Sequence, residues 1–227
     1  MLEASALNTG ACAPIPGASY YAFTLNSSPT NRPAAEHPDL NLGLRGYTTT
    51  IAYAGLLDLD GATYVQSPQL AGLFYDKRLP TPKHVYQVYD WNWGANTRGK
   101  PLSYPPVTMV GVAMTPGETI QVPDSSTNIG LGYAALVLYA APNRITLKYT
   151  GDDNVQRGYT LHLENICVEP SLLTLYQQLD AAGRSQLPAV RVGQSIGRAA
   201  TTELGIAVCD DGTFMDPRSR KDWWRGY

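Results

Sequence analysis

The sequence predicts an all-β protein built from antiparallel sheets, and three observations lead to this prediction. Short stretches in which apolar and polar residues alternate recur along the second half of the chain. Pro and Gly residues separate these stretches at short intervals. Charged residues make up only 16%, whereas Gly, Pro and Tyr number 21, 17 and 15, as is typical of loop-rich β proteins. Strands at this spacing favour a sandwich or a barrel.

Length and charge limit the classes of protein to consider. A chain of 227 residues is long enough for one domain with a sizeable extension. The formal net charge of −2 gives no reason to expect nucleic acid as a partner. The longest apolar runs, such as residues 133–142, are far shorter than the roughly 20 residues of a membrane helix. We therefore expect no membrane span.

We expect residues 1–82 to form an irregular N-terminal extension that packs on a β domain of residues 83–227. Residues 1–31 are rich in small and polar residues and lack sustained periodicity, except for one short strand at about 20–25. Residues 32–82 contain many Pro and Gly signals but also many leucines, which favours a cover wrapped over the core.

The first strands of the expected β domain lie at 108–114, 119–122 and 133–139, with Pro and Gly residues between them. One helix is expected at about 171–182. Pro170 and Ser171 provide its start signals and Gly183 provides its stop signal. Its apolar residues recur at the helical spacing i, i+3, i+4, i+7, which predicts one buried face: Leu172, Leu175, Tyr176 and Leu179.

Two hairpins are expected after the first strands. Residues 143–150 and 157–165 both alternate, and the turn-forming stretch 151–154 separates them. A second hairpin closes at Asp211-Gly212, a dipeptide that favours a tight two-residue turn.

In this order, the pieces of residues 143–217 resemble the second half of the lysostaphin-type zinc endopeptidases. These bacterial peptidoglycan metallopeptidases, which have the duplicated hybrid motif fold, cut peptide crosslinks in cell walls. The resemblance covers about a third of the chain and rests on the order of the pieces. The matching pieces are Asn143 with its strand, Thr160-Leu-His-Leu, residues 190–197, Glu203-Leu-Gly, and residues 212–217. The resemblance implies the peptidase fold, with the helix at 171–182 as an insertion.

The resemblance also implies where a metal centre would lie. The three zinc ligands of the family fall on Tyr86, Asp90 and Gly205, and the two assisting histidines fall on Glu203 and His162. Of the three ligands, only Asp90 is retained, and a zinc hydrolase needs three protein ligands with an open fourth position. A competing alignment of the first ligand pair uses His37 and Asn41, where an amide replaces the carboxylate. The chain has only three histidines, so no shifted alignment restores the set.

This broken pattern predicts a catalytically inactive binding or scaffolding module of the bacterial cell envelope or the extracellular space, without a metal or cofactor. The expected partners are peptidoglycan fragments or another envelope protein. Aromatic rings beside a few polar groups suit sugar or peptide recognition, and we expect such a ligand in the groove of the lost metal centre. We expect equally that the N-terminal extension fills this groove. The predicted ligand-binding residues are Asp90, Trp91, Trp93, His162 and Glu203.

Other interpretations remain open. In one, Asp90, His162 and Glu203 form a rebuilt metal site of a cell-wall hydrolase, because one His and two carboxylates can bind a divalent metal. In another, the protein is a structural subunit of an extracellular assembly whose extension pairs with a neighbouring copy. The aromatic cluster of residues 86–93 also suits simple packing in the core and at its rim.

The cysteines and the two ends of the chain give weaker indications. Cys12, Cys167 and Cys209 lack metal-type spacing, and we expect buried or lone thiols unless Cys12 approaches a strand cysteine. Residues 1–12 lack the basic and apolar regions of a signal peptide, so if the protein is exported, Met1 is not expected to be its natural start. Residues 218–225 are expected to form a solvated tail whose tryptophans pack on the body.

Overall fold

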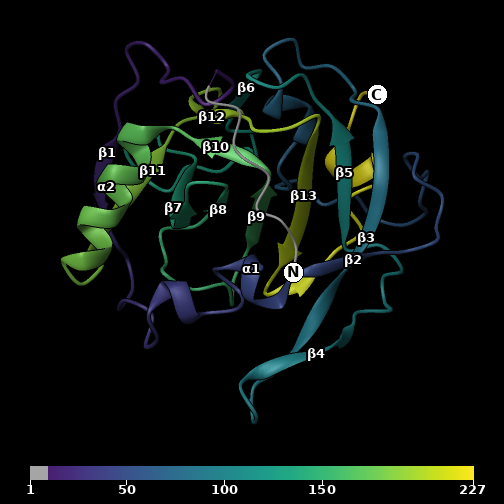
Figure 1. Ribbon diagram of the computed structural model, residues 1–227, viewed down its shortest axis with the longest axis horizontal. Helices are drawn as coiled ribbons and strands as arrows, with labels where there is room; N and C mark the ends of the chain where they lie inside the picture. Colours follow the sequence, from purple (N-terminus) through teal and green to yellow (C-terminus); the bar gives the residue numbers. More distant parts are fainter. Residues whose placement is uncertain (1–9) are drawn as a thin grey trace.

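The computed structural model describes residues 10–227 and confirms the all-β prediction, with 35% of residues in strands and 12% in helices. The larger of two antiparallel sheets has eleven strands (Figure 1). Its main path runs, in spatial order, through β1 (Tyr21–Thr24), β11 (Gln186–Val190), β7 (Ala135–Ala141), β8 (Arg144–Lys148), β9 (Tyr159–Glu164), β13 (Glu203–Asp210), β5 (Met109–Ala113), β3 (Pro82–Asn92) and β2 (Tyr47–Thr49). Off this path, β14 (Thr213–Phe214) pairs with β13, and β4 (Thr97–Pro101) pairs with β3.

A second, three-stranded sheet consists of β10 (Ile166–Val168), β12 (Ser195–Ala199) and β6 (Thr119–Gln121). Three α-helices accompany the sheets among residues 10–227: α1 (Leu42–Arg45), α2 (Pro170–Ala181) and α3 (Arg220–Trp223). Two short 3-10 helices, η1 (Ala34–Glu36) and η2 (Leu70–Leu73), lie in the N-terminal part. No helix in the described part of the chain is long and apolar enough to cross a membrane.

The two faces of the large sheet differ in character because side chains alternate along each strand. One face, called here the core face, carries Leu161 and Leu163 of β9 opposite Val208 and Ile206 of β13. These residues belong to one buried cluster that also includes residues of the small sheet, η2 and α3. The opposite face carries His162 and Glu164 of β9 and is partly covered by α1, so it is called here the α1 face.

Both expected hairpins are present. Strands β8 and β9 pair antiparallel, with Thr146 opposite His162. Strands β13 and β14 pair around Asp211 and Gly212, whose φ angles are 46° and 78°. Two successive positive φ values match the two-residue turn that an Asp-Gly dipeptide favours.

The expected helix is also confirmed, at Pro170–Ala181. Glu169 caps its N-terminus by accepting a hydrogen bond from the Ser171 backbone, and Gly183 follows its end with a φ of 92°. Of the four residues of the expected face, Leu172 and Tyr176 are buried, and the other two are half-buried. The helix lies against β11 and β7 at one side of the large sheet (Figure 1).

The N-terminal segment contributes to the same sheet. The expected strand at about 20–25 is present as β1, which pairs with β11, and β2 pairs with β3, so these two strands form the two ends of the sheet path. The apolar residues of 32–82 divide into two groups: Leu40, Leu42 and Leu70 are buried, whereas Ile51 is fully exposed. The part of the predicted irregular arm at residues 1–9 lies outside the described residues.

The sequence did not predict the hairpin of β3 and β4, which projects beyond the body of the protein (Figure 1). All five residues of β4 are exposed, so this strand has no buried face to impose an alternating pattern.

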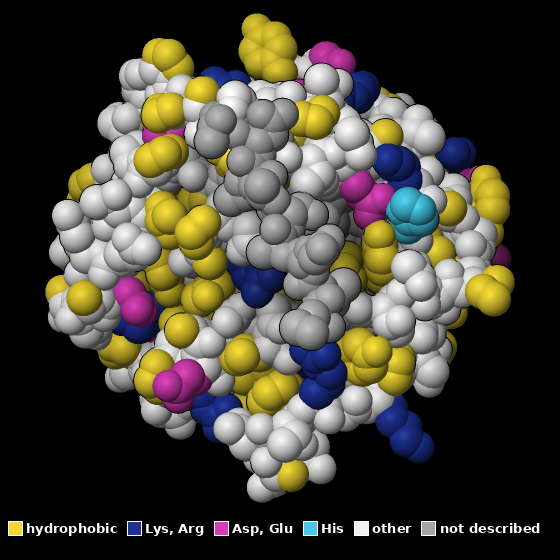
Figure 2. Space-filling model, in the orientation of Figure 1, with side chains coloured by type: hydrophobic (Ala, Val, Ile, Leu, Met, Phe, Trp, Pro, Cys, Tyr) yellow, Lys and Arg dark blue, Asp and Glu magenta, His cyan; other side chains and the backbone are white. Residues whose placement is uncertain are grey.

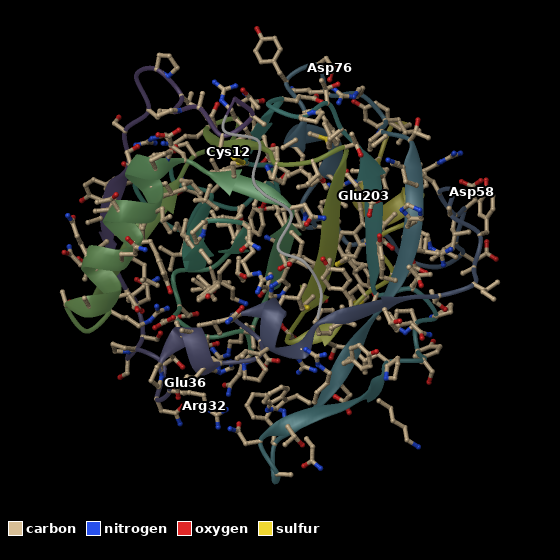
Figure 3. The ribbon with its side chains drawn as sticks, viewed as in Figure 1. Cys12, Arg32, Glu36, Asp58, Asp76 and Glu203 are labelled. Carbon is tan, nitrogen blue, oxygen red and sulfur yellow. A yellow bond between two sulfur atoms is a disulfide. The ribbon has the colours of Figure 1, made fainter. Side chains whose placement is uncertain are left out.

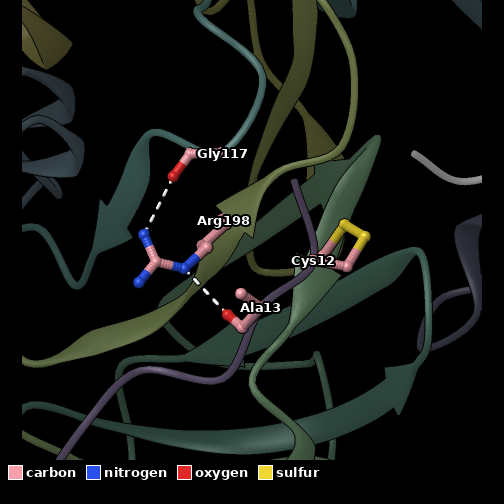
Figure 4. The surroundings of a disulfide bond; sticks show 5 residues. Cys12, Ala13, Gly117 and Arg198 are labelled. Carbon is pink, nitrogen blue, oxygen red and sulfur yellow. Dashed lines mark hydrogen bonds between the residues drawn. A yellow bond between two sulfur atoms is a disulfide. The ribbon is translucent and has the colours of Figure 1, made fainter. Parts of the chain in front are cut away.

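The prediction of lone thiols is wrong for two of the three cysteines. Cys12 forms a disulfide with Cys167 of β10, with the two Cα atoms 5.3 Å apart (Figure 4). The segment that carries Cys12 is held beside the small sheet by Arg198 of β12. The Arg198 guanidinium donates hydrogen bonds to the carbonyls of Ala13 (2.8 Å) and Gly117 (2.9 Å). Cys209 is a free, buried thiol, as expected.

The C-terminal run is not a solvated tail. Its tryptophans Trp223 and Trp224 are buried as expected, but the side chains of Arg218 and Asp222 are buried with them. Arg218 pairs with Asp216 at 2.6 Å, and Asp222 accepts a hydrogen bond from the Ser219 hydroxyl at 2.6 Å. Because each buried charge has a partner, the run can pack as part of the body.

Candidate functional site

Glu203, one of the predicted site residues, lies at the start of β13 on the α1 face. Its carboxylate accepts a hydrogen bond from the Tyr86 hydroxyl at 2.5 Å and lies 2.5 Å from Nδ1 of His84. The carboxylate occupies space above Gly111 of β5, where an added Cβ would collide with it. Burial and the Glu203 carboxylate raise the pKa of Tyr86, so its hydroxyl stays protonated. Figure 2 shows a histidine beside an acidic side chain at this place, where Figure 3 labels Glu203.

The next polar group along this face is the ion pair of Glu164 and Arg144, with 3.1 Å between Oε1 and Nε. Burial raises the pKa of Glu164 to about 7, against the opposing effect of the Arg144 charge. Gly205, at the position of a zinc ligand in the resembled family, lies between the two strands that flank it. An added Cβ would come within 3.1 Å of both Glu164 and Met109. The space above Gly205 is thus already occupied.

His162 lies further along the same face but is closed off from solvent, with 2% of its surface exposed. Its Nδ1 lies 3.1 Å from the Thr146 hydroxyl, and its ring stacks on Phe214 of β14 at 6.0 Å between centroids. Thr146 also donates a hydrogen bond of 2.6 Å to the carbonyl of Leu40, in the segment that leads into α1. Burial lowers the pKa of His162 to about 3, so the imidazole is neutral.

The three predicted polar residues do not converge. Glu203 and His162 share a face as expected, but His162 pairs with Ala207, four residues along β13 from Glu203. This offset corresponds to about 13 Å along the strand. Asp90 is exposed near the far end of β3, where its carboxylate lies 3.6 Å from Arg45. In the described part of the chain, no group of three or more His, Cys, Asp or Glu residues is placed to bind a metal. The alternative of a rebuilt metal site therefore lacks its geometry.

The predicted aromatic residues Trp91 and Trp93 lie at the end of the projecting hairpin, away from Glu203. Trp93 is 49% exposed and contacts two residues of the extension, His37 at 5.6 Å and Arg32 at 5.5 Å from its ring centre. Trp91 is half-buried, and its indole nitrogen has no hydrogen-bond partner in the described residues. The five predicted ligand-binding residues thus belong to three separate environments.

A cavity of about 530 Å³ lies elsewhere, beside β14 and α3, and is called here the C-terminal pocket. Three distant stretches line it: residues 57–64, 104–106 and 213–223. Leu59 and Tyr104 form an exposed rim, whereas Phe214 and Trp223 are buried. This pocket was not predictable from local sequence patterns, because no single stretch contains it. Two sequence features did indicate aromatic residues at this place: the Tyr104-Pro-Pro stretch and the paired tryptophans near the C-terminus.

Most polar groups of the C-terminal pocket are satisfied by the chain itself. The indole nitrogen of Trp223 donates to the carbonyl of Asp216 at 2.7 Å, and Asp222 pairs with Lys221 at 3.0 Å. The exposed carboxylate of Asp60 has neither an ion pair nor a hydrogen bond within residues 10–227. The pocket therefore offers mainly apolar and aromatic contact, with one free acidic group.

Compared with protein-family models, with curated proteins and with solved structures, the chain matches none of them.

Proposed function

We propose that this protein is a catalytically inactive binding module of the bacterial cell envelope or the extracellular space, with the fold of a degenerate lysostaphin-type peptidase. The observation that carries the proposal is the occupied α1 face. At the positions that the sequence resemblance aligns with zinc ligands, Tyr86 donates a hydrogen bond to Glu203, and Met109 and Glu164 occupy the space above Gly205. Under this proposal, Tyr86, Gly205 and Glu203 replace two zinc ligands and one assisting histidine of the family, and Tyr86 and Glu203 bind one another.

The C-terminal pocket supports a binding role. A concave site of this size, with aromatic walls and few polar groups, is typical of a site that recognises a ligand. Its floor is rigidly held, since Trp223 is buried and hydrogen-bonded, while its rim is exposed. The pocket shares Phe214 with the α1 face, where this ring stacks on His162, but Asp90, His162 and Glu203 do not line the pocket.

The disulfide supports a location outside the cytoplasm. Structural disulfides persist in secreted and envelope proteins and are rare in the reducing cytosol. The Cys12–Cys167 bond joins residues that are 155 positions apart and fixes the N-terminal segment on the small sheet.

Metal analysis together with a hydrolysis assay tests the proposal. Protein purified without chelator is expected to contain no stoichiometric zinc and to leave peptidoglycan and glycine-rich peptides intact. About one zinc per chain, lost together with hydrolysis in Asp90→Ala, would contradict the proposal.

A further inference from the structure

We propose that the C-terminal pocket binds an extended, proline-rich peptide that carries a basic residue beside its prolines. This inference rests on the proposed binding function and specifies the ligand class of that function.

The shape and lining of the pocket suit proline rings. Extended proline-rich segments dock into grooves lined by aromatic and apolar side chains, and they bind with little loss of conformational freedom. The C-terminal pocket offers the rings of Tyr64, Tyr104 and Phe214 together with Leu59, Pro105 and Met215. Tyr64 and Tyr104 come from two separate lining stretches. Tyr104 is 89% exposed, and Tyr64 is 39% exposed with the Lys221 Nζ 5.2 Å from its ring centre.

The hydrogen bonds of the pocket favour this peptide class over a sugar. A saccharide presents many hydroxyl groups, each of which needs a partner when it is buried. The carboxylates of Asp216 and Asp222 are already engaged by Arg218, Ser219 and Lys221. Proline has no backbone N–H, so a proline-rich segment makes few such demands.

The charges of the pocket supply the second part of the inference. The basic residues that line it already have acidic partners, since Lys221 pairs with Asp222 and Arg218 pairs with Asp216. Asp60 lines the pocket without such a partner in the described residues. A basic side chain beside the prolines would neutralise this carboxylate and fix the direction in which the peptide lies.

The test uses the full chain labelled with nitrogen-15 and three ten-residue peptides. The first peptide is proline-rich with one terminal arginine, the second has glutamine in place of the arginine, and the third combines the arginine with glycine and serine. The first is expected to bind about tenfold more tightly than the third and to shift the signals of Tyr64, Tyr104 and the Trp223 indole. A tetramer of N-acetylglucosamine tests the competing sugar class.

Two pairs of measurements provide the controls. Tyr104→Ala is expected to lower the affinity for the first peptide about tenfold, whereas Tyr75→Ala is expected to leave this affinity unchanged. These tyrosines are 89% and 84% exposed, and only Tyr104 lines the pocket, so the pair separates binding from folding. Asp60→Asn is expected to abolish the preference for the first peptide over the second.

The inference is overturned if Tyr104→Ala and Tyr75→Ala bind the first peptide equally well, if millimolar peptide shifts no pocket signal, or if the sugar tetramer shifts these signals instead. If peptidoglycan fragments shift only the NMR signals of residues around Trp93, the inference about the pocket is overturned and the proposed binding function stands. Zinc-dependent hydrolysis would overturn the proposed function itself.

Discussion

The α1 face and the C-terminal pocket are both built from segments that are distant in the sequence, yet one is filled and the other is open. On the α1 face, polar side chains project from adjacent strands and find partners across the sheet, as Glu203 does with Tyr86 and His84. The leading segment of α1 and β14 then cover His162. In the C-terminal pocket, buried aromatic residues form a floor, and no part of residues 10–227 fills the space above it. Two of the polar residues that indicate a site in the sequence, His162 and Glu203, thus lie on the filled face, whereas mainly apolar and aromatic residues form the open pocket.

The largest expected effect concerns the floor of the open region. Trp223→Ala should lower the free energy of unfolding by about 3–5 kcal/mol, because it removes a large buried side chain and leaves a cavity. Urea denaturation measures this loss. Trp93→Ala, at an exposed ring, should cost about 1 kcal/mol or less and serves as the control. Equal losses in the two variants would contradict the described burial.

Removal of the disulfide should have the next largest effect. Cys12→Ser should lower the free energy of unfolding by about 2–4 kcal/mol, because the crosslink restricts the unfolded chain. Chemical denaturation in the presence and absence of a reductant measures it. The reductant should lower the free energy of unfolding of the original protein and leave that of Cys12→Ser unchanged. An equal free energy of unfolding for the original protein with and without reductant would contradict a structural disulfide.

The pH dependence of the free energy of unfolding should report the burial of His162 on the α1 face. Its pKa is lowered to about 3 in the folded protein, so between its ordinary pKa of 6.5 and about 3 the unfolded state binds a proton that the folded state does not. Stability should therefore be full above pH 6.5 and fall by about 1 kcal/mol for each pH unit below it. Denaturation curves at several pH values measure the slope. The stability of His162→Phe should fall less steeply with decreasing pH than that of the original protein over this interval. Equal slopes for the two proteins would contradict the burial of a neutral imidazole.

The contribution of Glu164 to stability should change with pH in the opposite direction, over a narrower pH interval. Its pKa is raised from 4.5 to about 7, so its contribution to stability should be most favourable below pH 4.5 and should decline as the pH rises to 7. The difference in stability between the original protein and Glu164→Gln, measured from pH 4.5 to 7, isolates this contribution. A difference that does not change with pH would show that Arg144 fully compensates the burial of the carboxylate.

The smallest expected effect concerns the rim of the pocket. Tyr104→Ala should change the free energy of unfolding by no more than about 0.5 kcal/mol, since the ring is 89% exposed. Thermal and urea denaturation measure this change. A large loss would mean that Tyr104 supports the fold and would weaken its use as a probe of binding.

The sequence predicted the strands in which apolar and polar residues alternate. Strands β8 and β9 lie within such stretches, because apolar residues such as Leu161 belong to the core face and polar residues such as His162 belong to the α1 face, although both faces are buried. The helix α2 was predictable for a similar reason, from its apolar spacing and its end signals. The hairpin of β3 and β4 was not, because an exposed strand such as β4 carries no such pattern.

The candidate site was predictable only in part. Period-two alternation correctly places His162 and Glu203 on one face, but it does not determine how neighbouring strands align. The register that puts His162 opposite Ala207 separates the two side chains. The disulfide and the C-terminal pocket both depend on contacts between distant segments, for which local patterns contain no information.

The crosslink between Cys12 and Cys167 also has a mechanical consequence. It bypasses the stretch between these residues, which are 155 positions apart, and this stretch contains most of the large sheet. If the protein is attached at its two ends and pulled, the force passes through the sulfur–sulfur bond. About 500 Å of chain would be shielded from extension in this way. Oxidised protein under tension should therefore lengthen only by the segments outside this covalent ring, and reduction should release the rest.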